Sequence, residues 1–320
     1  MDKDRLVRTT KNTKKSAQPS HVSNGACSGR IVTHYGKQLE VEILEGPLAG
    51  TIQRSHQRAG IKSLVTGDLV LWEPDSLETG IVVSQHTRNN VFGRYDASGN
   101  FKPLASNLDC VMIVFAAIPK AFMNLIDRYL VAISNLQLNV FLVLNKMDLT
   151  NNAQDQSLQR MLQIYGGLGY PILRVSAKNG EGIRILEEKL SGQTTVLVGQ
   201  SGVGKSSLIN RLGSNELAKV GNLSQSKYKG THTTTTSRLY HLKNFDLIDS
   251  PGIREFGLTK VTRQEVVRGF PEIQSLATSC KFRDCSHSGE PSCAIRDGIR
   301  KGVISEERFD SYQNILGTLD

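Results

Sequence analysis

The chain lacks any hydrophobic stretch long enough to cross a membrane. Its longest apolar run covers residues 110–118, well short of the roughly 18 residues that a membrane-spanning helix requires, and a run of that length suits a buried strand. The first residues also contain no apolar core of the kind that secretory signal peptides carry. We therefore expect a protein of the reducing cytoplasm that makes no membrane contact.

Cysteine is scarce, with 5 residues in a chain of 320, and we expect no disulfides in a reducing compartment. Three of the five nevertheless fall close together and share their segment with a histidine, in the spacing Cys280-x4-Cys285-x-His287-x5-Cys293. Three thiolates and one imidazole form a closed tetrahedral zinc set, which is typical of a structural site rather than a catalytic one. Unrelated buried thiols are the alternative interpretation of the same residues.

Acidic residues are too few to balance the basic ones. The chain has 39 Lys and Arg against 30 Asp and Glu, a formal net charge of +9, and this excess predicts a polyanionic partner, with nucleic acid the leading candidate. Residues 1–28 combine several lysines and arginines with very few apolar side chains, so we expect a disordered basic arm there. The arm is either a solvated tail or a contact for phosphates.

The length of the chain predicts a multidomain protein with two or three folded units. Over residues 29–100 apolar and polar residues alternate and turn signals recur, which predicts about five short strands closed into an N-terminal β-barrel, an OB-fold. One candidate loop of this barrel is basic, and it either contacts a nucleic-acid backbone or is merely solvated. Its residues are Arg54, His56, Arg58 and Lys62.

Residues 101–258 show buried strands that alternate with amphipathic helices, the pattern of a doubly wound α/β domain with a largely parallel sheet. We expect strands at 109–116, 139–144, 172–175 and 195–198, and helices at 122–135 and 154–166. Residues 259–320 should form a third unit, a small α-helical zinc-binding domain that ends in a helix at 305–316.

A phosphate-binding loop follows the strand at 195–198. The stretch Gly199-Gln200-Ser201-Gly202-Val203-Gly204-Lys205-Ser206 fits the pattern G-x-x-x-x-G-K-S, and Ser207 extends the expected contact set. The glycines let backbone N–H groups turn toward the phosphates, Lys205 reaches the β- and γ-phosphate oxygens, and the Ser206 hydroxyl binds magnesium. A glycine-rich turn before an ordinary helix is the alternative, and the full match to the pattern disfavours it.

Two motifs upstream of this loop indicate a guanine base. In Asn145-Lys146-Met147-Asp148 the Asp148 carboxylate can accept both N–H donors of guanine, while Asn145 would join neighbouring loops and Lys146 would lie along the base. Ser176-Ala177-Lys178 follows the next strand, where GTPases place a backbone N–H toward the guanine oxygen. GTP and GDP are therefore the expected ligands.

Two further motifs lie downstream. Asp249-Ser250-Pro251-Gly252 matches D-x-x-G, in which Asp249 holds the magnesium shell and the Gly252 N–H senses the γ-phosphate. A threonine-rich loop at 229–236 should supply another magnesium ligand, most plausibly Thr234, although the register within 233–236 stays open.

The sequence lacks the glutamine that orients the attacking water in Ras-like GTPases, because Ile253 stands at that position. We expect His232, in the threonine-rich loop, to do this work, since an imidazole can hydrogen-bond a water near neutral pH. A surface histidine in a polar loop is the alternative.

The motif order, base-reading before phosphate-binding, is that of a GTPase whose sequence has been circularly permuted. With the expected barrel and the Cys3His loop, the chain resembles the ribosome small subunit-dependent GTPase A family from about residue 29 to about residue 316. The resemblance implies hydrolysis of GTP in late maturation of the small ribosomal subunit, binding to that subunit and its rRNA, and stimulation by it. We also expect a monomer.

Two other functions remain open at this point: a permuted GTPase that acts on the large subunit or another RNA, and an RNA-binding scaffold with a static nucleotide. Whichever ribosomal subunit a permuted GTPase acts on, the permutation means that the chain passes from the D-x-x-G motif into the zinc-binding unit. We therefore expect the γ-phosphate sensor to be coupled to that unit.

Overall fold

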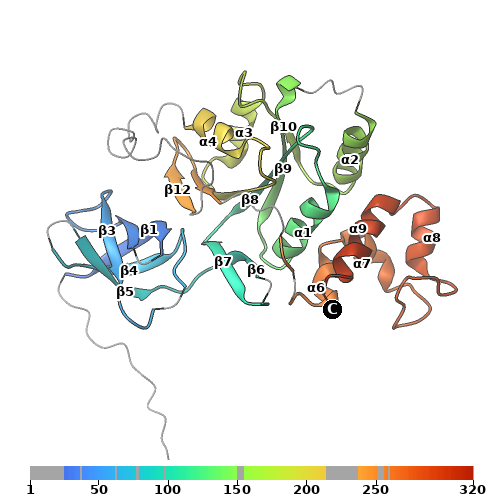
Figure 1. Ribbon diagram of the computed structural model, residues 1–320, viewed down its shortest axis with the longest axis horizontal. Helices are drawn as coiled ribbons and strands as arrows, with labels where there is room; N and C mark the ends of the chain where they lie inside the picture. The colour runs from blue at the N-terminus through green and yellow to red at the C-terminus, as the bar shows by residue number, and fades with distance from the viewer. Residues whose placement is uncertain are drawn as a thin grey trace, which may run out of the picture.

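The computed structural model describes residues 25–36, 38–61, 63–76, 79–96, 98–149, 155–213, 237–250, 256–258 and 260–319. These residues form a β-barrel, a central α/β unit and a C-terminal helical unit, which lie one after another along the long axis of the molecule (Figure 1). Among the helices of the described ranges, none is both long and apolar enough to span a membrane.

The N-terminal unit is a closed five-stranded barrel, as the alternating pattern predicts. Its strands are hydrogen-bonded in the order β1-β2-β3-β5-β4, and a further β1–β4 pairing closes it. The strands β3 and β5 are parallel and the other pairs antiparallel, which is the arrangement of an OB-fold. The bounds are β1 Cys27–Tyr35, β2 Gln38–Ile43, β3 Ile52–Gln57, β4 Leu69–Pro74 and β5 Thr79–Gln85.

The barrel interior is packed around Trp72, whose indole nitrogen donates to Ser55 Oγ at 2.9 Å. Gly80 is required beside it, because a Cβ at that position would lie 2.1 Å from the indole ring. One expectation for this unit is wrong: Arg54 and His56 do not lie on a loop but on the exposed face of β3. The sequence does not indicate this strand, because the residues that follow Ile52 are polar at every position and show no alternation with apolar ones.

The central unit is a doubly wound α/β fold, which confirms the predicted class. Its parallel strands run in the order β10-β9-β8-β11-β13, and β12 pairs antiparallel to β13 at the edge. The elements in chain order are β8 Cys110–Ala116, α1 Met123–Ile133, β9 Asn139–Asn145, the 3-10 helix η1 Met147–Leu149, α2 Gln156–Gly167, β10 Ile172–Arg174, α3 Ile183–Leu190, β11 Thr194–Val198, α4 Lys205–Leu212, β12 Arg238–His241 and β13 Asp246–Asp249.

The two faces of this sheet carry separate apolar cores. Leu130 of α1 and Leu158 of α2 belong to one cluster of buried side chains, whereas Leu186 of α3 and Leu208 of α4 belong to another. Because side chains of a strand alternate between the faces, helix pairs on both sides complete a three-layer unit. The motifs that begin at Asn145, Ser176, Gly199 and Asp249 all lie at the carboxyl ends of parallel strands of this sheet.

Two features of the strand pairing are not indicated by the sequence. A hairpin of β6 Val91–Tyr95 and β7 Phe101–Ser106 forms a separate two-stranded sheet, and it lies across the expected domain boundary after residue 100. In addition, β1 of the barrel pairs with β12 at Thr33 and Arg238. The strands of the barrel and of the central unit therefore belong to one continuous hydrogen-bonded sheet.

The C-terminal unit is helical, with α6 Arg263–Arg268, α7 Pro271–Ala277, α8 Ala294–Arg300 and α9 Glu306–Leu316. The last helix matches the expected one closely. The other three are six or seven residues long, too short to show a clear helical period in the sequence. Helix α9 packs against α1 of the central unit (Figure 1).

Candidate functional site

The phosphate loop joins β11 to α4, and its glycines have backbone angles that other residues rarely adopt. Gly199, Gly202 and Gly204 have φ values of 143°, 84° and 92°. A Cβ at Gly199 would also lie 2.1 Å from the Val114 carbonyl oxygen. These constraints explain why the sequence needs glycine at these three places.

Lys205 begins helix α4 and folds back over the loop. Its Nζ donates to the carbonyl oxygens of Gly199 at 2.8 Å and Gln200 at 3.1 Å. Ser206 and Ser207 follow it in the first helical turn and are exposed. The ammonium group and the Ser206 hydroxyl therefore lie at the N-terminal end of α4, where the helix dipole also favours an anion.

Asn145 connects the base-reading segment to its two neighbours. Its Nδ2 donates to the Val203 carbonyl oxygen at 2.9 Å, and its Oδ1 accepts from the Ala177 N–H at 3.2 Å. The Lys146 Nζ donates to the Ile118 carbonyl oxygen at 3.0 Å. Three motifs that are distant in the sequence are thus joined at one edge of the sheet.

Asp148 lies on η1, beside the motif of residues 176–178. Its carboxylate accepts from Ser176 Oγ at 2.6 Å, and the Lys178 Nζ lies 3.7 Å from the other oxygen. The Ser176 hydrogen bond, with a smaller contribution from Lys178, holds the pKa of Asp148 below its usual range. The group is therefore an ionised acceptor at neutral pH, as recognition of two N–H donors requires.

Asp249 ends β13 and faces the same region as Lys205. Burial raises the pKa of Asp249 to about 6, although the Lys205 charge opposes this shift. Burial also lowers the pKa of Lys205. Buried charged groups are stabilised by opposite charges nearby. An anionic phosphate would supply one for Lys205, and a divalent cation would supply one for Asp249.

The donor set around Asp249 suits magnesium. A carboxylate and the Ser206 hydroxyl are hard oxygen ligands of the kind that Mg²⁺ prefers. The next residue, Ser250, fixes the strand end, because its Oγ donates to the Leu197 carbonyl oxygen at 2.5 Å. The predicted residues His232, Thr234, Gly252 and Ile253 lie outside the described residues.

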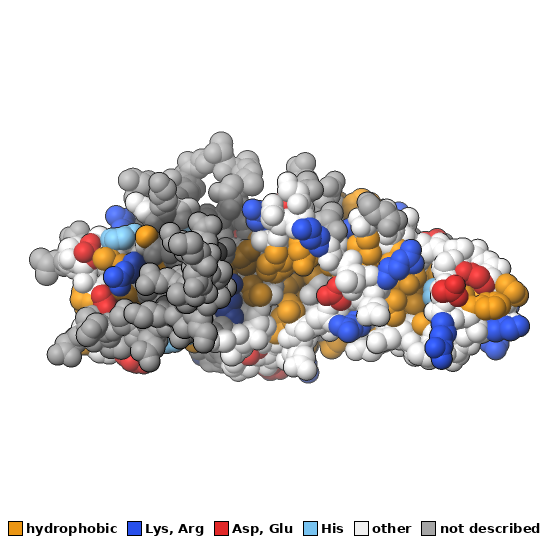
Figure 2. Space-filling view, turned by 90° about the horizontal axis from the view of Figure 1, so that it is seen from below, with side chains coloured by type: hydrophobic (Ala, Val, Ile, Leu, Met, Phe, Trp, Pro, Cys, Tyr) orange, Lys and Arg blue, Asp and Glu red, His pale blue; other side chains and the backbone are white. Residues whose placement is uncertain are grey.

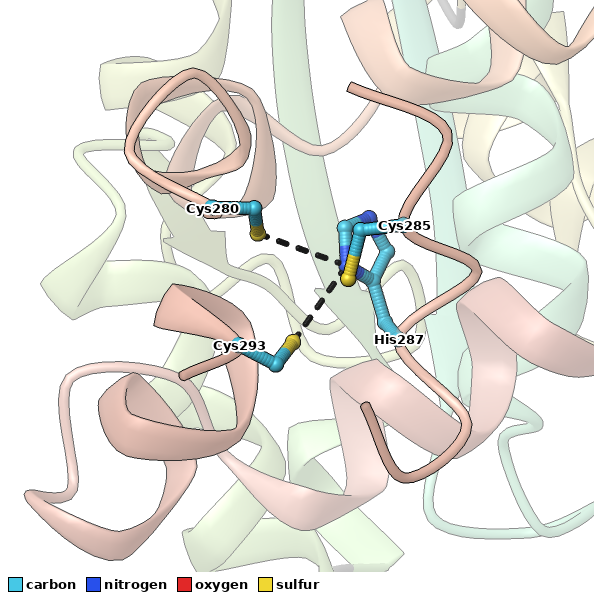
Figure 3. Close-up of side chains that lie close together, drawn as sticks. All are labelled: Cys280, Cys285, His287 and Cys293. Atoms are coloured by element: carbon cyan, nitrogen blue, oxygen red, sulfur yellow. Dashed lines mark hydrogen bonds between the residues drawn. The ribbon is translucent and has the colours of Figure 1, made fainter. Parts of the chain in front are cut away.

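The four predicted zinc ligands meet between the end of α7 and the start of α8 (Figure 3). Their ligand atoms all lie within 4.8 Å of one another. The Nδ1 atom of His287 is 3.7 Å from Cys280 Sγ and 3.5 Å from Cys293 Sγ. Tetrahedral zinc with bonds of about 2.1–2.3 Å places neighbouring ligands roughly 3.6–3.8 Å apart, so the cluster is compatible with one zinc ion.

The surroundings of His287 favour the form of the side chain that binds metals. Burial lowers the pKa of His287, which favours the neutral imidazole that metals bind. Arg296 on α8 donates from Nε to the His287 carbonyl oxygen at 2.9 Å. That bond holds the loop against the helix that carries the last cysteine, Cys293, at its N-terminal cap.

Sequence reasoning missed a buried ionic cluster between the central and C-terminal units. Arg308 of α9, Asp127 of α1 and Glu272 of α7 are paired there with almost no solvent exposure. No local signal marks these residues, because a charged side chain in a helix would ordinarily be assigned to the solvated face.

Comparisons with known proteins agree with the site. The sequence model of the family described as RsgA GTPase matches residues 85–259. The small ribosomal subunit biogenesis GTPase RsgA of Pseudomonas fluorescens (strain SBW25) is 46% identical over 293 residues, 91% of this chain and 85% of that protein. The protein of the same name from Ectopseudomonas mendocina (strain ymp) is 47% identical over the same shares.

Two solved structures share the fold. YjeQ from Thermotoga maritima has a TM-score of 0.71 and 28% sequence identity, covering 92% of this chain and 98% of that one. YloQ, described as a circularly permuted GTPase, has a TM-score of 0.67, with 95% and 98% of the two chains covered. At 23% identity, the second comparison supports the fold alone.

The fold and the order of the nucleotide motifs define a circularly permuted GTPase. Identity of 46% across nine-tenths of the chain then sets the family: the chain belongs to the RsgA GTPases.

Proposed function

We propose that the chain hydrolyses GTP in the biogenesis of the small ribosomal subunit and is stimulated by that subunit. The observation that carries the nucleotide choice is the position of Asn145, which joins the Asp148 segment to the phosphate loop and so sets base recognition beside phosphate binding. The choice of subunit rests on the names of the relatives, small ribosomal subunit biogenesis GTPases.

In this proposal each motif residue has one task. Asp148 accepts the two guanine donors, with the flanking residues Met147, Ala177 and Lys178 enclosing the base. The phosphate-loop N–H groups and Lys205 bind the β- and γ-phosphates, and the Gly252 N–H contacts the γ-phosphate. Ser206, Thr234 and Asp249 would hold Mg²⁺, which supplies neutralisation of the phosphate charge.

We assign the orientation of the attacking water to His232. An imidazole there would accept a proton or a hydrogen bond from the water, in place of the glutamine of Ras-like enzymes. A His232→Ala variant should keep GTP binding but lose roughly 10²-fold of the subunit-stimulated rate, the usual scale for a positioned general base. If the subunit-stimulated kcat values of the parent and His232→Ala agree within about threefold, a ribosomal group orients the water instead.

The C-terminal unit is proposed to bind one structural zinc through Cys280, Cys285, His287 and Cys293, within a domain that spans about residues 259–320. The other proposed units are the basic arm 1–28, the barrel 29–100 and the nucleotide domain 101–258. We place the protein in the cytoplasm as a monomer.

Binding to rRNA is supported by exposed basic residues. Lys and Arg side chains recur from the middle of the molecule to the C-terminal unit on the face drawn in Figure 2. Exposed basic residues of the C-terminal unit include Lys281, Arg283, Arg300 and Lys301. Their attraction to phosphates is electrostatic, so binding should weaken steeply as salt is raised.

The test is multiple-turnover GTP hydrolysis by the purified chain alone, with small subunits and with large subunits, at matched salt. We expect strong stimulation by small subunits only. Stimulation by large subunits instead would show that the GTPase acts on the large subunit. Single-site binding without turnover under every condition would instead identify an RNA-binding scaffold with a static nucleotide.

A further inference from the structure

Strand β12 lies between the barrel and the central sheet and pairs with both of them (Figure 1). Its first residue, Arg238, is opposite Thr33 of β1 on one side and opposite Asp249 of β13 on the other. In the described part of the chain, Thr33 and Arg238 are the only residues at which β1 and β12 pair. One row of paired residues across the sheet therefore connects the barrel to Asp249, the proposed magnesium ligand.

Three side chains of the barrel hold the start of β12. Glu40 Oε2 of β2 lies 3.4 Å from Arg238 Nη2, and the Tyr35 hydroxyl accepts from Arg238 Nη1 at 3.5 Å. Thr66, which is almost completely buried, donates from Oγ1 to the Ser237 carbonyl oxygen at 3.1 Å. Because both the backbone and the side chains at this point are bonded to the barrel, the position of the barrel sets the position of β12.

Arg238 and Asp249 project from the same face of the sheet, because directly paired residues of neighbouring strands point to one side. Tyr240 is on this face too, and the Arg238 guanidinium lies 6.0 Å from the centre of its ring. Burial is the main cause that raises the pKa of Tyr240, the Asp249 charge raises it further, and the Arg238 charge lowers it. The three side chains therefore form one group beside the proposed metal site.

The other end of β12 has a separate set of contacts with the barrel. The His241 imidazole lies 2.7 Å from Asp246 of β13 and 3.1 Å from Glu42 of β2. Arg30 of β1 also pairs with Asp246. Asp246 is three residues before Asp249, about 10 Å along the strand, and an odd separation places the two side chains on opposite faces. The barrel thus contacts both ends of β12, and only one end adjoins Asp249.

We infer that Arg238 is a positioning residue for Asp249: its ion pair with Glu40 of the barrel fixes β12 against β13 and so sets where the Asp249 carboxylate lies. The inference rests on the proposed magnesium-dependent GTPase and adds the barrel to the support of its metal site. A displacement of the barrel, as on binding rRNA, would then be passed to Asp249 through β12.

The experiment measures the release of a fluorescent GDP analogue from the purified chain, without ribosomal subunits, in excess Mg²⁺ and in EDTA. Glu40→Gln removes the charge that pairs with Arg238 and keeps the size of the side chain. In Mg²⁺ this variant should release the nucleotide roughly tenfold faster than the parent, the lower end of the loss that follows removal of a contact supporting a metal ligand. In EDTA the two rates should be equal, because the phosphate and base contacts are unchanged.

GTP hydrolysis gives a second measurement. The Mg²⁺ concentration that half-saturates hydrolysis should rise by a similar factor in Glu40→Gln, while kcat at saturating Mg²⁺ stays that of the parent. The melting temperature should change little, because the Glu40–Arg238 pair is partly solvated. A purely structural role of the pair would not shift the magnesium requirement alone.

Glu42→Gln is the matched control, because it makes the same change two residues along β2, at the pair with His241. It should release the nucleotide at the parent's rate in both conditions. The double variant Glu40→Gln with Arg238→Gln should be no faster than Arg238→Gln alone, since both changes break one ion pair.

A parent-like rate for Glu40→Gln in Mg²⁺ overturns the inference, as does an equal acceleration in Glu42→Gln or an acceleration that persists in EDTA. A parent chain that releases GDP at the same rate with and without Mg²⁺ would instead reject the proposed magnesium site itself. The failure of the inference and the failure of the proposed function are therefore distinguishable.

Discussion

Arg308 of helix α9 donates to Asp127 of helix α1 in the interior of the molecule, and the two side chains are 1% and 0% exposed. Its Nε also donates to Glu272 at 2.7 Å, and its guanidinium lies 4.1 Å from the centre of the Phe270 ring. One arginine therefore fastens the C-terminal unit to the nucleotide domain. Such a desolvated pair specifies one docking geometry even where its net contribution to stability is modest.

Removing this arginine should destabilise the protein strongly. Arg308→Met leaves two buried carboxylates without a counter-charge, and we expect a loss of about 3–5 kcal/mol in the free energy of unfolding, measured with urea. Arg160→Met is the control, because it breaks an exposed α2–α9 pair with Glu307 and should change stability little. Equal effects of the two substitutions would contradict the importance of burial.

The junction between barrel and nucleotide domain should depend on pH. His241 on β12 lies 2.7 Å from Asp246 and 3.1 Å from Glu42 of the barrel. The hydrogen bonds with Asp246 and then Glu42 raise the pKa of His241 to about 9, against the effect of burial. Burial would raise the pKa of Asp246, but His241 and Arg30 together lower it.

Because the folded pKa of His241 exceeds its ordinary value of 6.5, its stabilising effect is complete below pH 6.5 and disappears as the pH rises through about 9. The pair is partly solvated, so we expect a loss of about 1 kcal/mol or less. The measurement is the difference in unfolding free energy between the parent and His241→Gln at pH 6 and at pH 10. A difference that does not shrink at high pH would show that His241 contributes by packing alone.

The parts of the fold that could be predicted are those with strong local patterns. The strand β8 is apolar throughout and fully buried, and the phosphate loop is specified by adjacent residues. By contrast, β12 has only four residues, two of them charged or polar, and its pairing with β1 joins positions about 200 residues apart. No local pattern encodes a partner at that distance.

The site shows the same division. Asn145 could be assigned its linking task from the motif, whereas the bond from Lys146 to the Ile118 carbonyl could not, because Ile118 belongs to no recognisable pattern. The packing of Tyr129 against Phe256 likewise joins residues that are distant in the sequence and belong to no recognisable motif. Such contacts come only from the three-dimensional structure.

If the Cys3His cluster binds zinc as proposed, loss of the metal should have a local effect. Elemental analysis of protein purified without chelator should find one zinc per chain, and Cys285→Ser should release it, because structural zinc requires its full ligand set. The loop between α7 and α8 should then become sensitive to proteolysis, while GTP affinity stays nearly unchanged. Cys110→Ser, which alters a cysteine of β8 outside the cluster, should retain the zinc.

Absence of zinc from the parent would contradict the metal assignment. A collapse of GTP binding in Cys285→Ser would contradict the separation of the zinc loop from the nucleotide domain.

Base selectivity should depend on the charge of Asp148. As a carboxylate held ionised by Ser176, it would accept two hydrogen bonds from guanine in the proposed complex, whereas adenine offers no such pair of donors. Asp148→Asn replaces one acceptor with a donor and should weaken GTP binding by about 1–3 kcal/mol, the scale of a charge-assisted hydrogen bond. Xanthosine triphosphate, whose base presents an acceptor at that edge, should bind the variant better than it binds the parent.

Asp297→Asn is the matched control, because it changes an exposed carboxylate on α8 that is paired with Arg300, and it should leave both affinities unchanged. The dissociation constants of the two nucleotides, measured by calorimetry for the three proteins, decide the assignment: equal GTP affinity in the parent and Asp148→Asn would mean that another group reads the base.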